Sequence, residues 1–200
     1  EATMKPRHLL FIMLTLVLTS GLTVTLPQAA IFNVDHTGDD TVPTCDDDTP
    51  DDCSLRGAIL AANALSEAST LNVPAGTYVL SQSSTCTYRD KGSSPGIFTL
   101  SQIPLCLSKQ ITIQGAGAAS TIIDGDQRGH VLFVSADAVA EVRGVTLRND
   151  IGSGFVTTQS GGGGMQNHGT LTLTETVVRD NTLPANRIGQ GAGIYNVGSL

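Results

Sequence analysis

A repeat of about 30 residues is the feature that most limits how this chain can fold. GGGMQNHGTL (162–171) matches GAGIYNVGSL (191–200) at an offset of 29 residues. A looser match sets VRGVTLRND (142–150) on LTETVVRDN (173–181) at an offset of 31, and Ile113 precedes Val142 by 29. Repeats of this length are typical of stacked units that each contact mainly their neighbours. The second half of the chain is therefore expected to be a solenoid.

Short β-type runs separated by turn residues indicate what each repeat contains. These runs lie at 77–80, 97–100, 110–113, 121–123, 131–134 and 145–147. With aromatic residues at only 4%, the core must come from Val, Ile, Leu and Thr, which favour strands. We predict an all-β parallel β-helix over 71–200, cut off at its C-terminal end. Asn167 should lie over Asn196 and form an amide ladder in a turn.

An amphipathic helix is expected before the first coil. Asp52 or Ser54 can cap it, and the predicted helix spans 54–66. One face carries the apolar residues Leu55, Ala58, Ile59, Ala62 and Leu65. Because two or three turns of helix are not stable alone in water, this face must lie on another element. We expect the helix, with a strand at 31–34, to form an N-terminal cap over 31–70 that seals the open end of the solenoid.

An aspartate-rich loop with cysteines separates the expected strand from the helix. Residues 35–52 contain eight aspartates and two prolines, so they are predicted to be irregular. The four cysteines allow three disulfide connectivities. We favour Cys45–Cys53 with Cys86–Cys106, because each pair closes a local loop.

The first 30 residues resemble a secretory signal peptide. Lys5 and Arg7 follow Met4, the expected start, and precede the apolar run 9–18; small residues end the segment, and cleavage is expected after Ala30. The competing interpretation is a retained membrane anchor, for which the run is short. A formal net charge of −7 argues against nucleic-acid binding. An exported chain with an even number of cysteines is expected to be secreted or at the cell surface, with membrane contact only through export or a missing C-terminal anchor.

The motif CSLRGAILAAN (53–63) resembles the CSLREA-type N-terminal domain of bacterial surface and secreted proteins. GTYVLS (76–81) and ITIQGAGAASTIIDG (111–125) are similar to the first coils of right-handed parallel β-helices with the pectin-lyase-like fold. The glycine-rich units after residue 160 resemble repeats of that class, including polymorphic outer-membrane proteins. The chain departs from the motif at Gly57, where the family has glutamate, so no role can be carried over for that carboxylate.

Calcium is the first chemical hypothesis, because it binds oxygen ligands from acidic loops. The best candidate ligands are Asp46, Asp48, Asp51 and Asp52. The competing interpretation is a solvated acidic loop, because the segment fails the EF-hand pattern at Asp51 and Gly57. No other cofactor is expected.

A polysaccharide-cleaving site is the second hypothesis, since the resembled fold also hosts such enzymes. The turn 124–130 offers Asp124, Asp126, Arg128 and His130; Arg148 and Arg179 should lie one coil apart, with Asp150 and Asp180 beside them. The alternative interpretations are that Asp124 only forms a turn and that the arginines and aspartates form a solvated, charge-balanced stripe. His168 is interpreted as a variable turn residue. We expect no catalytic residue within this chain, because no acid and nucleophile pair repeats across the coils.

The favoured function is a non-enzymatic scaffold or adhesion module that contacts cell-surface glycans or proteins. The alternative is the N-terminal part of a polysaccharide lyase or glycoside hydrolase with its catalytic coils beyond residue 200.

Overall fold

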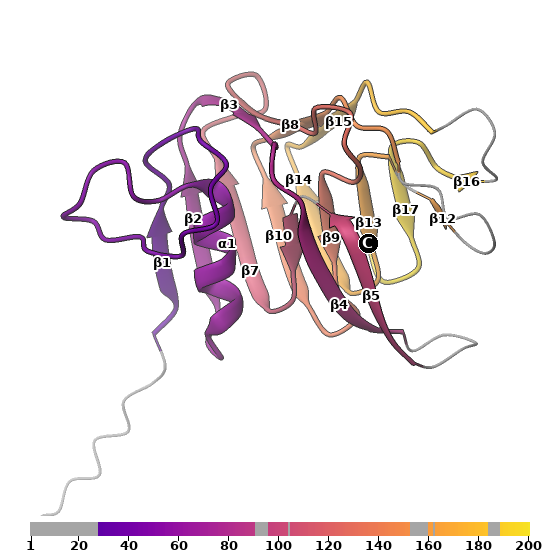
Figure 1. The fold of residues 1–200 in the computed structure, drawn as a ribbon, viewed down its shortest axis with the longest axis horizontal. Coiled ribbons are helices and arrows are strands. Elements are labelled where there is room, and N and C mark those ends of the chain that lie inside the picture. Colours follow the sequence, from indigo (N-terminus) through magenta and orange to yellow (C-terminus); the bar gives the residue numbers. More distant parts are fainter. Residues whose placement is uncertain (1–27, 91–95, 104, 153–159, 162, 184–188) are drawn as a thin grey trace, which may run out of the picture.

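The computed structural model describes residues 28–90, 96–103, 105–152, 160–161, 163–183 and 189–200. The described chain is strand-rich, with parallel sheets and one helix (Figure 1). The first sheet joins, in order, β1 (Ala30–Asn33), β2 (Ser69–Val73), β7 (Gln110–Gly115), β10 (Val139–Arg143) and β14 (Thr170–Thr174). The second joins β15 (Val177–Arg179), β11 (Thr146–Arg148), β8 (Thr121–Asp124) and β3 (Gly76–Val79). The third joins β17 (Ile194–Asn196), β13 (Met165–Asn167), β9 (Leu132–Val134) and β6 (Leu105–Leu107).

Successive passes of the chain visit these three sheets in the same order. Strands β7, β8 and β9 are followed by β10, β11 and β13, and each pairs in parallel with its equivalent in the next pass. A short parallel pair, β12 (Ser160–Gly161) with β16 (Gly189–Gln190), adds a further contact between the last two passes. This parallel pairing fits the solenoid that the sequence predicts.

The register of the strands agrees with the repeat offsets. Ile113 pairs with Val142 in the first sheet, and Asn167 pairs with Asn196 in the third. In the second sheet Arg148 pairs with Arg179. The amide ladder is also present, because Asn167 Nδ2 donates to Asn196 Oδ1 at 2.7 Å. The sequence match thus predicted which residues lie one above another.

One expected coil strand is wrong. Residues 97–100 belong to β5 (Gly96–Ile103), which pairs in an antiparallel hairpin with β4 (Ser84–Asp90). The hairpin is inserted between β3 and β6 and lengthens the first pass of the chain. A short apolar run indicates a strand but not the direction of its partner, so the sequence pattern could not separate the two arrangements.

Helix α1 (Leu55–Ala64) begins one residue after its N-cap, Ser54, whose Oγ accepts the Gly57 amide at 2.9 Å. It is shorter than the expected 54–66, because Leu65 already has extended backbone. The helix contacts β1, β2 and β6. Its apolar face is therefore positioned beneath the first pass of the chain.

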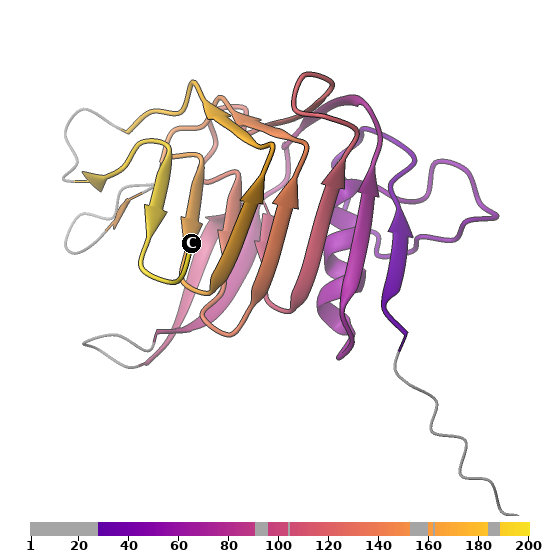
Figure 2. The ribbon, with the colours of Figure 1, turned by 180° about the vertical axis from the view of Figure 1, so that it is seen from behind.

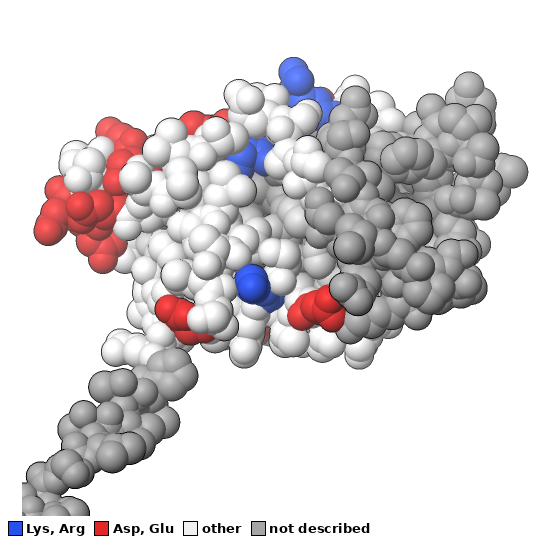
Figure 3. All heavy atoms as spheres, turned by 60° about the horizontal axis from the view of Figure 1, so that its bottom comes forward, with Lys and Arg blue, Asp and Glu red and all other residues white. Residues whose placement is uncertain are grey.

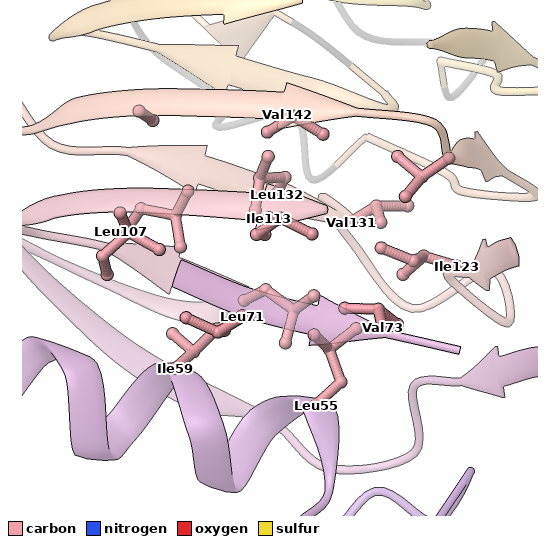
Figure 4. Packing of buried hydrophobic residues seen from close by; sticks show 14 of the residues in the cluster. Leu55, Ile59, Leu71, Val73, Leu107, Ile113, Ile123, Val131, Leu132 and Val142 are labelled. Atoms are coloured by element: carbon pink, nitrogen blue, oxygen red, sulfur yellow. The ribbon is translucent and has the colours of Figure 1, made fainter. Parts of the chain in front are cut away.

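Leu55 and Ile59 point from α1 toward Leu71 and Val73 of β2, as Figure 4 shows. All four side chains are at most 2% exposed and belong to the main apolar core. Full burial of one such side chain contributes about 1.5–3 kcal/mol to stability. The core continues from here through Ile113 to the later strands, so the helix and the sheets share one interior.

Two disulfides each join residues that lie close in the sequence. Cys45 is bonded to Cys53 and Cys86 to Cys106, which is the pairing that local loop closure favoured. The first joins the acidic loop to the start of α1, and the second joins the hairpin to β6. These bonds are consistent with an extracellular protein.

The N-terminal leader lies almost entirely outside the described residues. Ala30, after which cleavage is expected, is the first residue of β1, and its amide donates to the Ala68 carbonyl at 2.9 Å. In the part of the chain that the structure describes, no helix has the length and hydropathy needed to span a membrane.

Candidate functional site

The acidic loop uses its carboxylates to hold its own backbone. Asp52 Oδ2 accepts the Asp46 amide at 3.1 Å, and Asp46 Oδ1 accepts the Asp48 amide at 3.1 Å. Asp51 has a φ of 60°, a left-handed conformation that aspartate tolerates in turns. Among the described residues, no three His, Cys, Asp or Glu side chains come together as a metal site requires. Calcium binding by Asp46, Asp48, Asp51 and Asp52 stays a hypothesis.

Asp35 connects this loop to the strand before it. Its Oδ1 accepts the Cys53 amide at 3.0 Å and its Oδ2 accepts the Asp52 amide at 3.3 Å. Desolvation opposes ionisation of Asp35, but the hydrogen bonds from the backbone amides outweigh it and lower the pKa of the carboxyl. Figure 3 shows how the acidic side chains gather at this end of the molecule.

A buried ion pair between Asp39 and Arg56 was missed by the sequence reasoning. Arg56 Nε donates to Asp39 Oδ1 at 2.6 Å, and the two side chains are only 2% and 4% exposed. Asp39 Oδ2 also accepts the Ser81 and Gln82 amides at 2.6 and 2.7 Å. The pair therefore joins the acidic loop, the helix and the segment after β3. An arginine in the predicted helix directly after an acidic loop was the available signal, but the eight aspartates of the loop left its partner undetermined.

Gly57 is explained by the path of the same loop. A Cβ at this position would lie 2.3 Å from the Val42 carbonyl oxygen. The loop backbone thus crosses directly over the helix where the resembled motif carries glutamate. A side chain at position 57 would therefore require the loop to move.

The turn after β8 places Asp124 beside a cation from the next strand. Arg148, its partner in the register, donates through Nε to Asp124 Oδ2 at 2.9 Å, and Asn149 Nδ2 donates to Oδ1 at 2.7 Å. Burial tends to raise the pKa of Asp124. Hydrogen bonds from Asn149, from the Asp126 amide and from Arg148 lower it, as does the positive charge of Arg148, and their combined effect is larger. Both oxygens of this ionised carboxylate are therefore engaged.

The other charged residues expected at this turn do not converge on Asp124. Arg128 pairs with Asp126 at 2.9 Å on the surface, whereas His130 is 3% exposed. Arg179 lies one pass beyond Arg148, as predicted, but its guanidinium contacts Asp180. Arg128 and Arg179 each pair with a neighbouring aspartate and not with Asp124.

Asp150 is the most perturbed ionisable group that the structure describes. It is 1% exposed; its Oδ1 accepts the Gly129 amide at 2.8 Å, while Oδ2 has no hydrogen-bond partner among the described residues. The Asp150 amide donates to Asn181 Oδ1 at 3.1 Å, so the residue is positioned between successive passes. Burial raises the pKa of Asp150 to about 8, although the amides of Gly129 and Ile151 act in the opposite direction. At neutral pH this side chain is mostly a neutral acid.

His168 lies in the turn after β13, as expected, and its ring faces two aromatic side chains. Its ring centroid lies 5.2 Å from that of Phe133 and 6.3 Å from that of Tyr195. Phe133 is fully buried with Cys86, and Cys106 packs against them, on the side of β9 that faces away from the main core. The hairpin disulfide and these rings therefore cover the outer face of the third sheet.

A pocket of about 240 Å³ lies between α1 and the strands β4 and β6. Ile59, Leu60 and Leu105 give it a mainly apolar lining. Its polar lining residues are Arg56, Asn63, Ser84, Thr85 and Ser108. Asn63 donates to the Cys106 carbonyl at 2.7 Å and accepts the Ser108 amide at 2.9 Å, and Arg56 pairs with Asp39.

Asp39 and Asp124 are thus paired with cations, Asp35, Asp46 and Asp52 accept backbone amides, and Asp150 is buried as the neutral acid. This arrangement is suited to holding strands and loops together. Comparison of the chain with protein-family models, with curated proteins and with solved structures found no match.

Proposed function

We propose that this chain is a segment of a right-handed parallel β-helix that a bacterium exports as a non-enzymatic scaffold or adhesion module. The observation that carries the proposal is the in-register parallel pairing of three sheets over successive passes. Right-handedness is the expected hand for crossovers between parallel strands. A stack of this kind supplies a long, rigid surface, which is what a scaffold or adhesin needs.

The capping helix and the disulfides support export to the cell surface. Helix α1 covers the apolar interior at the leading end, where an open stack would expose strand edges. The Cys45–Cys53 and Cys86–Cys106 bonds fit an oxidising compartment. The resemblance of residues 53–63 to the CSLREA-type domain points the same way. Glycans or proteins of a cell surface are the proposed partners.

Two assays on the purified chain test this proposal. We expect the chain to be retained on immobilised cell-surface glycans or proteins and to release no reducing or unsaturated products from polygalacturonate and other glycans. Product release that scales with the amount of chain would overturn the non-enzymatic assignment.

A carbohydrate-active enzyme is the second candidate, and one observation favours it. Asp124 has a lowered pKa and Asp150 a raised one, and carboxyls with opposite shifts are typical of acid and base pairs. The exposure of Asp150, only 1%, argues against contact with a substrate. If products are released, Asp150→Asn should abolish their release, whereas a variant of the exposed Asp126 should not.

A further inference from the structure

The outer face of the first sheet carries two rows of polar side chains in register. Thr70, Thr112, Glu141 and Thr172 form one row, and Asn33, Asn72, Gln114, Arg143 and Thr174 form the other. The exposed apolar Ile31 precedes Thr70 in the first row, and a shorter third row holds Gln110, Val139 and Thr170. They alternate with buried residues such as Leu71, Ile113 and Val142, so they lie on the face opposite the core. We call the nine polar residues of the first two rows the polar ladder.

Contacts within the polar ladder hold part of it in a fixed arrangement. Asn72 Nδ2 donates to Asn33 Oδ1 at 2.8 Å, and Arg143 Nη2 donates to Gln114 Oε1 at 2.6 Å. Arg143 also lies 3.7 Å from Glu141. Fixed polar side chains lose little conformational entropy when they bind a partner.

The face is open in the described structure. Figure 2 shows the five strands of the first sheet side by side, with no other described segment in front of them. The third sheet differs, because its outward-pointing Phe133 is completely buried in the cluster with Cys86. Of these two sheets, only the first presents its outward side chains to solvent.

The chemistry of the polar ladder fits a neutral polymer of sugars. Its spacing is about 4.8 Å between strands and about 6.8 Å between alternate residues, so hydroxyl and amide groups recur at regular intervals. Its single cation and single anion, Arg143 and Glu141, balance. Nucleic acids require clustered cations, and the net charge of −7 disfavours acidic glycans. Protein partners favour aromatic anchors, and no ladder residue is aromatic.

We propose that the polar ladder binds a neutral polysaccharide by hydrogen bonds to the hydroxyls of successive sugar units. The inference rests on the proposed adhesion function and assigns that function a surface and a class of ligand. Hydroxyls of Thr70 and Thr112, which are neighbours in the register, supply part of the contact.

The test measures how strongly the wild-type chain and the double variant Thr70→Val/Thr112→Val bind insoluble cellulose and chitin. Bound protein is separated from free protein by sedimentation. Valine removes the hydroxyls but keeps the branched shape that strands favour, and circular dichroism checks the fold. Thr77→Val is the matched control, since Thr77 is exposed on β3 in the second sheet. We expect the double variant to lose about fivefold or more in affinity for the polysaccharide that binds wild type, because two hydrogen bonds are lost, and the control to bind as wild type does.

The remaining outcomes separate the surface from the function. Binding by the folded double variant equal to that of wild type would overturn the assignment of the polar ladder but leave the adhesion proposal standing. Preference of wild type for polygalacturonate would overturn the neutral ligand class. If wild type binds neither cellulose nor chitin, the ladder proposal fails; adhesion itself fails only if binding to immobilised cell-surface glycans and proteins is absent as well.

Discussion

Replacing Asp150 by asparagine should change how the stability of the protein depends on pH. The folded state holds the pKa of Asp150 at about 8, against an ordinary value of 3.8. Below pH 3.8 the carboxyl is protonated in both the folded and the unfolded chain and has no effect on this balance. Between these two values the unfolded chain releases the proton while the folded chain keeps it. Rising pH therefore favours unfolding.

The size of the effect follows from the shift. Each pH unit in this interval lowers the free energy of unfolding by about 1.4 kcal/mol, so the Asp150 contribution falls by about 2.7 kcal/mol between pH 5 and pH 7. This loss is a large part of the roughly 5–15 kcal/mol that stabilises a typical domain. Asparagine keeps an oxygen to accept the Gly129 amide and has no charge to bury.

Urea denaturation followed by circular dichroism at pH 5, 6, 7 and 8 measures this, since the chain has no tryptophan to report by fluorescence. The stability advantage of Asp150→Asn over wild type should be smallest at pH 5, should grow by about 2.7 kcal/mol between pH 5 and pH 7, and should widen further toward pH 8. Asp126→Asn serves as the control, because Asp126 lies on the surface. Parallel stability curves for wild type and Asp150→Asn would refute the reasoning, because they would mean that the folded protein does not hold Asp150 protonated.

Three further predictions concern the N-terminal cap. Asp39→Ala should lower the free energy of unfolding by about 3 kcal/mol or more in urea denaturation, because it leaves the Arg56 charge buried without its partner. Asp48→Ala, in the same loop, is the control and should change that free energy by less than about 0.5 kcal/mol. Replacing glycine by alanine inside a helix usually stabilises it by about 1 kcal/mol. Gly57→Ala should instead lower the melting temperature, because the new methyl group would meet the Val42 carbonyl. A higher melting temperature would show that the loop does not cross the helix there. Because the loop carboxylates already accept backbone amides, calcium at millimolar concentration should produce no binding heat in calorimetry and no shift in melting temperature. A saturable signal would instead support calcium binding by the acidic loop.

The repeated sequence determined much of the fold by itself. When a chain stacks on its own repeats, equivalent positions must meet, so the offsets predicted the pairs Ile113–Val142 and Asn167–Asn196. The apolar face of the helix likewise had to be covered, because so short a helix is unstable in isolation. Local loop closure was sufficient to favour the observed disulfide pairing.

The tertiary structure decided the features that depend on which partner a residue meets. An apolar run at 97–100 indicated a strand, yet only the folded chain shows that the partner is antiparallel. Asp39, rather than another aspartate of its loop, reaches Arg56, because the loop crosses the helix at Gly57. The raised pKa of Asp150 has the same origin, since burial between successive passes is a property of packing. Periodicity reports which side of an element is buried; the identity of its neighbours depends on contacts between residues far apart in the chain.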